Sequence, residues 1–155
     1  MSDYEKLRTW KRAHALVLRV YEVTRSFPAS ERTGLTASLR GAAISIATRL
    51  AEGCARHDDE ALARSARTAR VAANELHYLT RVAMDVQLVS TIEATRLFAS
   101  VDEVCRLLDA LAARLGRDLT SRDGSRRDRA TPAARVSGPV LAPTEPRGVA
   151  PISRR

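Results

Sequence analysis

Apolar residues recur at three- and four-residue steps through most of the first 115 residues, which is the spacing of amphipathic α-helices. Short polar stretches interrupt the repeat and divide it into segments. We expect helices over residues 7–26, 30–54, 59–86 and 91–115. No segment shows the strict alternation of a β-strand, and connections of roughly four to six residues favour antiparallel neighbours. The pattern therefore predicts an all-α protein built as an antiparallel up-down four-helix bundle.

The first segment carries an apolar stripe that we expect to pack in the core or at an interface. Leu16, Val20 and Val23 widen the stripe on one side. Pro28 ends the helix, because a residue before proline disfavours the helical conformation. The stripe consists of Leu7, Trp10, His14, Val17, Tyr21 and Thr24.

The second segment is apolar on two sides and needs cover from two directions. Ser30 is expected to cap its start. One stripe consists of Leu35, Leu39, Ala42, Ile46 and Leu50, and the other of Ala43, Ile44, Ala47 and Ala51. Such a helix lies either centrally in a bundle or at a contact between subunits. We assign Ile44, Ala47 and Ala51 to the interface of a homo-oligomer.

The third and fourth segments have clear core positions. The third opens with acidic residues, in accord with the helix dipole, and alanine on its buried side lets a neighbouring helix approach closely. The fourth follows the heptad spacing of knobs-into-holes packing, with Ser90 or Thr91 as its cap and Gly116 at its end. The expected core positions are Leu62, Ala66, Ala69, Ala73, Leu76, Leu79 and Ala83, followed by Leu97, Val101, Val104, Leu108, Leu111 and Leu115.

The helical pattern stops after Leu115. Five of the six prolines follow it, and the remaining stretch contains no aromatic residue. Such a segment buries too little apolar surface to offset the entropy of ordering. We therefore expect two regions, a four-helix bundle over residues 1–115 and a disordered basic tail over residues 116–155.

Positive charge is concentrated in this tail. Residues 1–115 hold 17 Lys and Arg against 14 Asp and Glu, a difference of +3, and residues 116–155 hold 9 against 4, a difference of +5. Together these give the net charge of +8. Such a balance favours nucleic acid or another anionic surface as a partner.

Several features indicate a cytoplasmic protein with no membrane partner. No apolar run approaches the ~20 residues of a membrane span, and the N-terminus is too charged for a secretory signal. Cys54 and Cys105 fit no metal spacing, and two thiols without a signal peptide indicate a reducing compartment.

Three blocks in order carry a family resemblance. They are YEKLRTWKRAHALVLRVYEVTRSFP (residues 4–28), ERTGLTASLR (residues 31–40) and LRGAAISIATRLAEG (residues 39–53), with Asn-Glu-Leu following at residues 74–76. These blocks resemble the small bacterial four-helix-bundle proteins encoded in intervening sequences of 23S ribosomal RNA genes. The resemblance covers roughly residues 4–115 and leaves out the tail.

The resemblance implies a homo-oligomer, commonly a pentameric barrel of bundles. It also implies kinship with the accessory variability determinant of diversity-generating retroelements, a basic barrel that binds nucleic acid and a reverse transcriptase. This chain departs from the family where members usually carry Pro-Ala-Asn, because it has Ala47, Thr48 and Arg49. Any role of that asparagine is in doubt here.

No catalytic or cofactor-binding constellation is recognisable in the sequence. A di-metal bundle needs Glu-x-x-His pairs on two helices, and none of His14, His57 and His77 follows a glutamate by three residues. No phosphate loop, nucleophile elbow or zinc spacing appears. We therefore expect a protein that is not an enzyme and uses neither a metal nor an organic cofactor.

The third segment carries a basic face opposite its core stripe. At ~100° per residue its polar side chains share about a third of the helix circumference, and arginines spaced in this way suit phosphate contacts. The candidate nucleic-acid contacts are Arg67, Arg70, Asn74, His77 and Arg81 on this face, extended by Arg49, Arg56 and Arg64.

Three interpretations of this face remain open. It contacts nucleic acid, with RNA favoured over DNA only through the resemblance, or it is a solvated helix face that carries arginine because it must be polar. Alternatively, the protein is a protein-interaction module or a retroelement accessory factor. In the protein-interaction module the arginines would have no direct part in binding nucleic acid, and the accessory factor would have no direct catalytic role.

Overall fold

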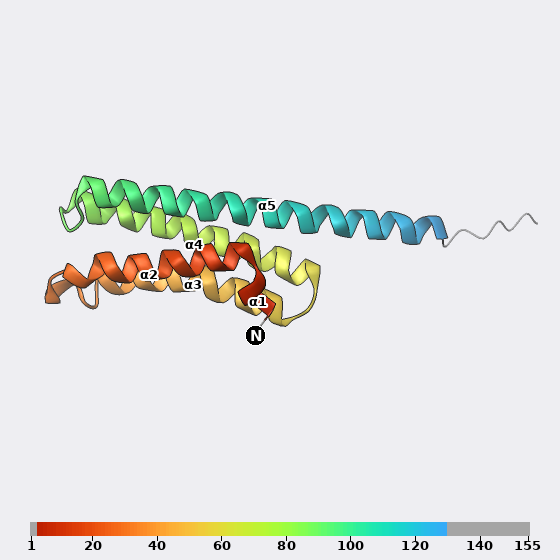
Figure 1. The fold of residues 1–155 in the computed structure, drawn as a ribbon, viewed down its shortest axis with the longest axis horizontal. Helices are drawn as coiled ribbons and strands as arrows, with labels where there is room; N and C mark the ends of the chain where they lie inside the picture. The colour runs from red at the N-terminus through yellow and green to blue at the C-terminus, as the bar shows by residue number, and fades with distance from the viewer. Residues whose placement is uncertain (1–2, 130–155) are drawn as a thin grey trace, which may run out of the picture.

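The computed structural model describes residues 3–129, and within them the side chains of residues 4–117. Figure 1 shows long helices lying side by side, with the last helix running past the end of the others. A short helix α1 (Asp3–Lys6) comes first, and the 3-10 turns η1 (Thr24–Ser26) and η2 (Ala29–Glu31) connect the first long pair. The long helices are α2 (Arg8–Val23), α3 (Leu35–Ala55), α4 (Asp59–Asp85) and α5 (Thr91–Arg129).

The long helices form an antiparallel four-helix bundle. Each packs against the next one along the chain, and α2 also packs against α5, which closes the ring. No β-strand occurs among residues 3–129. The predicted all-α bundle is confirmed. Residues 130–155, which belong to the predicted tail, lie outside the described residues.

One hydrophobic core runs along the inside of the bundle. All six heptad positions predicted in α5 are buried, and Val101 and Leu108 are 0% exposed. Helix α3 contributes Leu39, Ile46 and Leu50, and all three are buried as predicted. The alanine stripe of α4 is also buried, so the small side chains lie where neighbouring helices come close.

The buried side of α2 differs from the predicted stripe. His14 and Tyr21 are exposed, and Trp10 and Val17 are only partly buried. The buried residues of α2 are Thr9, Ala13, Leu16 and Val20. The predicted stripe therefore lies at the edge of the core. Two adjacent apolar stripes on one helix leave the choice between them to the packing partners.

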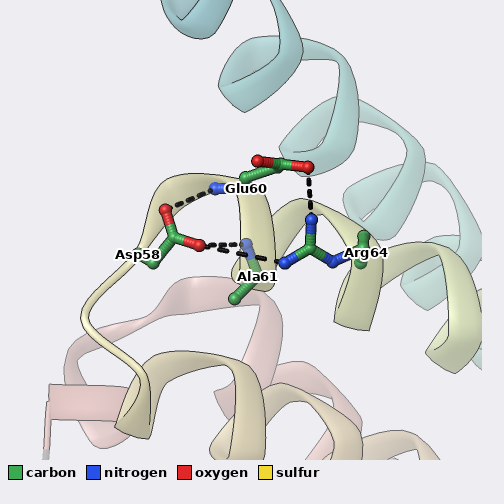
Figure 2. A network of polar contacts seen from close by, with 4 residues as sticks. All are labelled: Asp58, Glu60, Ala61 and Arg64. Carbon is green, nitrogen blue, oxygen red and sulfur yellow. Dashed lines mark hydrogen bonds and ion pairs between the residues drawn. The ribbon is translucent and has the colours of Figure 1, made fainter.

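Local side-chain hydrogen bonds define the starts of α4 and α5. The Asp58 carboxylate accepts from the backbone N–H groups of Glu60 and Ala61, at 3.2 and 3.0 Å, as Figure 2 shows. At α5 the Ser90 hydroxyl accepts from the Glu93 N–H at 3.2 Å, and the Glu93 carboxylate accepts in return from Ser90. This reciprocal pair is a capping box, so Ser90 caps α5, one of the two predicted candidates.

Helix α3 begins later than predicted. Ser30 lies within η2. The residue before the helix is Gly34, which has no side chain to make a capping hydrogen bond. Instead the Glu31 carboxylate accepts from the Leu35 N–H at 3.1 Å. The prediction of Ser30 as the cap was wrong because the chain after Pro28 makes a separate 3-10 turn before α3 starts.

Helix α5 continues well beyond its predicted end. It passes through Gly116 and ends at Arg129, so Gly116 is not a C-cap and an irregular chain does not begin there. Leu115 is nevertheless the last buried residue among those whose side chains are described. A single glycine weakens a helix by about 1 kcal/mol without ending it, and the first proline after Leu115 is Pro132.

Gly53 lies at a close approach of α3 and α4. A Cβ atom at this position would lie 2.7 Å from the Ser65 Cβ and 3.1 Å from the Leu62 Cδ1. Both atoms belong to packed side chains of α4, which have little room to move. Steric space therefore explains why the Arg-Leu-Ala-Glu-Gly block ends in glycine, because any side chain there would push the two helices apart.

Replacing Gly53 by alanine is expected to lower the free energy of unfolding by about 1–3 kcal/mol, the usual cost of overpacking a core. The matched control is Gly116→Ala, where an added Cβ meets no atom within 4 Å and the higher helix propensity of alanine should add about 0.5–1 kcal/mol. Urea unfolding followed by circular dichroism measures both changes. A destabilising Gly116→Ala would contradict the continuous α5, and a neutral Gly53→Ala would contradict the close approach.

Candidate nucleic-acid and subunit interfaces

The outward side of α4 carries part of the predicted basic face. Arg67, Asn74 and Arg81 are exposed in succession along the helix. Val71 and Tyr78 lie between them, and these two side chains are 68% and 66% exposed. We call these five residues the outer row of α4. The row combines two guanidinium groups with an amide and an aromatic ring, all open to solvent.

Two of the predicted residues lie toward α5 instead. The Nε atom of Arg70 lies 3.3 Å from Oδ2 of Asp109, and its Nη1 donates to Oδ1 of Asn74. The ring of His77 packs on Phe98, with the ring centres 4.6 Å apart. Arg70 and His77 therefore line the contact between α4 and α5, where Asp109 offsets the arginine charge.

The predicted arc thus divides between two surfaces. The side chain of Arg70 is only a third exposed, and an ion pair of this kind contributes at most about 1 kcal/mol to stability. Arg81 stays in the outer row, although its guanidinium carbon lies 5.6 Å from the centre of the Phe98 ring. None of the ion pairs among residues 4–117 involves Arg67 or Arg81.

Arg49 extends the outer row across to α3. Arg49 and Arg67 line an open hollow of about 380 Å³ between the two helices, together with Ser45 and Thr68. Glu75 also lines the hollow, and the Arg49 Nη1 lies 3.3 Å from the Glu52 Oε2. The hollow therefore offers two positive groups and hydroxyl donors, with nearby carboxylates that weaken the field.

Arg64 is engaged at the start of α4. Figure 2 shows it between two carboxylates, with its Nη2 3.9 Å from Oδ2 of Asp58 and its Nη1 bonded to Oε1 of Glu60. These partners offset its charge and hold it near the helix start. Arg56 is exposed and follows the last residue of α3.

The residues predicted for a subunit contact do lie together on one face. Ile44 is 40% exposed, and Ala47 and Ala51 are partly buried beside it on α3. They line a groove of about 290 Å³, whose other wall is formed by Trp10 and Val17 of α2. This groove between α2 and α3 is apolar over most of its lining.

Three ring-bearing residues, Tyr4, Trp10 and His14, line this groove. The Trp10 ring stacks on His14 at 5.0 Å, and the Tyr4 ring lies 4.8 Å from Trp10. Sequence reasoning missed Tyr4 because it precedes the first periodic segment. The short helix α1 places Tyr4 over the groove, and a one-turn helix leaves no recognisable repeat in a sequence.

Metal-binding and nucleophilic chemistry find little support in the described part of the chain. No group of three or more His, Cys, Asp or Glu side chains there could hold a metal ion. Cys105 is buried in the core, and burial raises the pKa of its thiol above the ordinary value of 9.0, although the nearby Arg70 charge opposes the shift. A thiol with a raised pKa is a poor nucleophile at neutral pH.

Two further findings bear on the class of protein. Within residues 3–129, no helix has the length and apolar character needed to cross a membrane. A comparison with curated proteins gave no match. The family model described as 23S rRNA-intervening sequence protein matches residues 5–110, which is most of the chain and nearly all of the bundle core. The chain therefore belongs to the family of 23S rRNA-intervening sequence proteins.

Proposed function

We propose that this protein is a non-enzymatic, homo-oligomeric scaffold that binds nucleic acid, with RNA favoured, through the outer row of α4 and Arg49. The observation that carries the proposal is the composition of this row. It presents Arg67 and Arg81 with no carboxylate paired to either among residues 4–117, and it places the exposed Tyr78 ring between them. Guanidinium groups bind phosphate, and an exposed aromatic ring stacks on unpaired bases.

The spacing of the row supports an extended ligand. Arg67 and Arg81 are fourteen residues apart, which is about 21 Å at the ~1.5 Å rise of an α-helix. This distance corresponds to about six nucleotide steps at ~3.4 Å per step. One strand of nucleic acid lying along α4 would therefore meet a positive group near each end and Asn74 and Tyr78 between.

Oligomerisation is the second part of the proposal. The groove between α2 and α3 exposes Ile44 beside Trp10, and a second copy of the chain would cover these apolar side chains. A closed ring, with the pentamer as the arrangement that the family resemblance implies, would repeat the outer row around its circumference. Repetition of weak sites on one assembly raises the overall affinity.

Replacing Arg49, Arg67 and Arg81 together by glutamine is expected to weaken binding of single-stranded RNA at least tenfold at ~50 mM salt. The slope of log K against log salt should fall by about 2, since each lost phosphate contact removes about 0.7 for a single strand. Fluorescence anisotropy measures both quantities. The charge-matched control replaces Arg8, Arg96 and Arg114, which are exposed and lie on other helices, and should change the affinity far less.

Two results would contradict the proposal. If the intact protein binds neither RNA nor single-stranded DNA at this salt concentration, the nucleic-acid function is wrong. If binding persists in the triple variant but disappears when the chain ends at Leu115, the residues after the bundle provide the affinity and the outer row does not.

A second candidate function is a protein-interaction module, possible partners being a reverse transcriptase or another subunit of a retroelement complex. The observation that favours it is the exposure of large apolar side chains on α2 and α3, where Leu18, Tyr21 and Ile44 are 58%, 42% and 40% exposed. In that case the arginine variants would leave partner binding intact. A reverse-transcriptase gene beside the gene for this protein would favour the retroelement role.

A further inference from the structure

The connection between α2 and α3 encloses a second basic site, separate from the outer row of α4. A hollow of about 330 Å³ lies against this connection. Its polar lining consists of the three arginines Arg25, Arg32 and Arg40 and the two hydroxyl residues Thr24 and Thr36, and residues 27–29 complete the wall. The arginines come from η1, from the residue after η2 and from α3, so they approach the hollow from different elements.

The positive charge of this hollow is not neutralised within the described part of the chain. None of the ion pairs among residues 4–117 involves Arg25, Arg32 or Arg40. No carboxylate lines the hollow. Glu31 is the acidic residue of the connection, and its carboxylate accepts from the Leu35 N–H at 3.1 Å, which directs it to the start of α3.

Arg40 is held in place with part of its hydrogen-bonding capacity unused. Its Nε donates to the Thr24 hydroxyl at 2.8 Å, and its guanidinium carbon lies 4.4 Å from the centre of the Tyr21 ring. The Thr24 hydroxyl in turn donates to the carbonyl of Val20 at 2.7 Å. Because the fixed contact uses Nε, the two terminal nitrogens of the planar group can bind an acceptor in the hollow.

Thr36 supplies an independent sign of a missing partner. Its side chain is 6% exposed, and its Oγ1 has no hydrogen-bond partner within the described part of the chain. Buried hydroxyl groups are hydrogen-bonded in the great majority of cases, because an unpaired hydroxyl loses its hydrogen bonds to water without gaining one in the protein. Thr36 lines the same hollow as the three arginines, so a ligand in the hollow can supply the missing acceptor once the hydroxyl rotates toward it.

We propose that this hollow binds a phosphate group, free or carried on a nucleotide or an RNA end. A tetrahedral phosphate offers oxygens in several directions, which matches guanidinium groups from three elements. The Thr36 hydroxyl would donate to one of these oxygens after rotating about its Cα–Cβ bond. A planar carboxylate carries one charge and two oxygens in a plane, so it matches guanidinium groups from three elements less well. The site does not depend on the proposed nucleic-acid surface, since it shares no residue with the outer row.

The first test measures the melting temperature of the full-length protein during titration with inorganic phosphate at constant ionic strength. Low millimolar concentrations keep the general stabilising effect of phosphate small. We expect a saturable rise in melting temperature with the intact protein. In the double variant Arg25→Gln and Arg32→Gln this rise should be lost over the same concentrations, because the Kd for phosphate should increase at least tenfold. The charge-matched double variant Arg96→Gln and Arg114→Gln should keep the rise. No rise in the intact protein, an equal rise with acetate, or an equal rise in both double variants would overturn the proposal.

Thr36→Val distinguishes a ligand-binding hydroxyl from a structural one. Removing an unpaired buried hydroxyl should raise the melting temperature of the ligand-free protein, and it should weaken phosphate binding several-fold. The opposite pair of results, a lower melting temperature with an unchanged Kd, would show that Thr36 serves only the fold and would remove the main evidence for the site.

A last comparison identifies the source of the phosphate. A short RNA with a 5′-phosphate is titrated against the same RNA with a 5′-hydroxyl, in the intact protein and in the Arg25→Gln, Arg32→Gln variant. Tighter binding of the phosphorylated RNA that is lost in the variant supports the site with a nucleotide as the carrier. Binding of inorganic phosphate without any preference between the two RNAs supports it with free phosphate as the ligand.

Discussion

A single charge at Ile44 is expected to dissociate the protein into monomers of 17.0 kDa. Ile44→Asp would place a carboxylate on the apolar groove between α2 and α3, beside Ala47 and Trp10. If a second copy covers this groove, the carboxylate loses its hydration without gaining a partner, and the cost of several kcal/mol exceeds what a small apolar contact provides. Light scattering after size-exclusion chromatography measures the mass of the intact protein and the variant.

The control for this experiment is Ile92→Asp. Ile92 is 67% exposed near the start of α5, where a negative charge interacts favourably with the helix dipole, so this variant should keep the mass of the intact protein. Because Ile44 is already 40% exposed within one subunit, the variant should also stay helical by circular dichroism. An intact protein that is monomeric at ~10–100 µM, or an assembled Ile44→Asp variant, would show that this groove is not the subunit contact.

Truncating Leu76 to alanine is expected to lower the free energy of unfolding by about 2–5 kcal/mol, the usual range for a buried leucine. Helix α4 contributes nine buried residues, of which seven are alanine and one is threonine, so Leu76 is its only large buried side chain. The side chain is 0% exposed. Its loss would leave a cavity that the flanking alanines are too small to fill, and total stabilities are commonly only about 5–15 kcal/mol.

Val71→Ala is the matched control on the same helix. Val71 is 68% exposed in the outer row of α4, so losing its methyl groups should change the stability by no more than about 0.5 kcal/mol. Chemical unfolding of both variants under the same conditions measures the difference. Similar losses for Leu76→Ala and Val71→Ala would mean that α4 does not pack with its alanine side inward.

The sequence predicted the residues of the candidate nucleic-acid interface only in part. Arg67, Asn74 and Arg81 follow one side of α4, as their angular spacing indicates, whereas Arg70 and His77 lie toward α5. The separation of Arg70 from this arc depends on Asp109, which is 39 residues away in the chain and lies beside it only after α4 and α5 pack. The proposed phosphate site also depends on folding, because the unpaired hydroxyl of Thr36 and the proximity of Arg25 and Arg40 exist only in the folded connection.

The sequence by itself determined the four helical segments of the bundle and most core positions of α3, α4 and α5, although Leu35, Leu62 and Leu79 are only partly buried. Periodicity specifies these features, because a repeat near 3.6 residues allows one continuous apolar stripe and the heptad of α5 has a single such stripe. Local chemistry limited the cap of α5 to Ser90 or Thr91, and the structure shows that it is Ser90. These features depend on neighbours along the chain.

The structure was needed to show which of two apolar stripes of α2 faces the core, where α3 starts, and how far α5 continues. On α2 the small side chain of Ala13 faces the core and Trp10 lies at its edge. On α5 Gly116 is helical because one unfavourable residue does not end a helix. The choice between the stripes of α2 is made by contacts between distant segments, which form only when the bundle folds. Helix α5 runs past the ends of the other helices, so its continuation does not depend on such contacts (Figure 1).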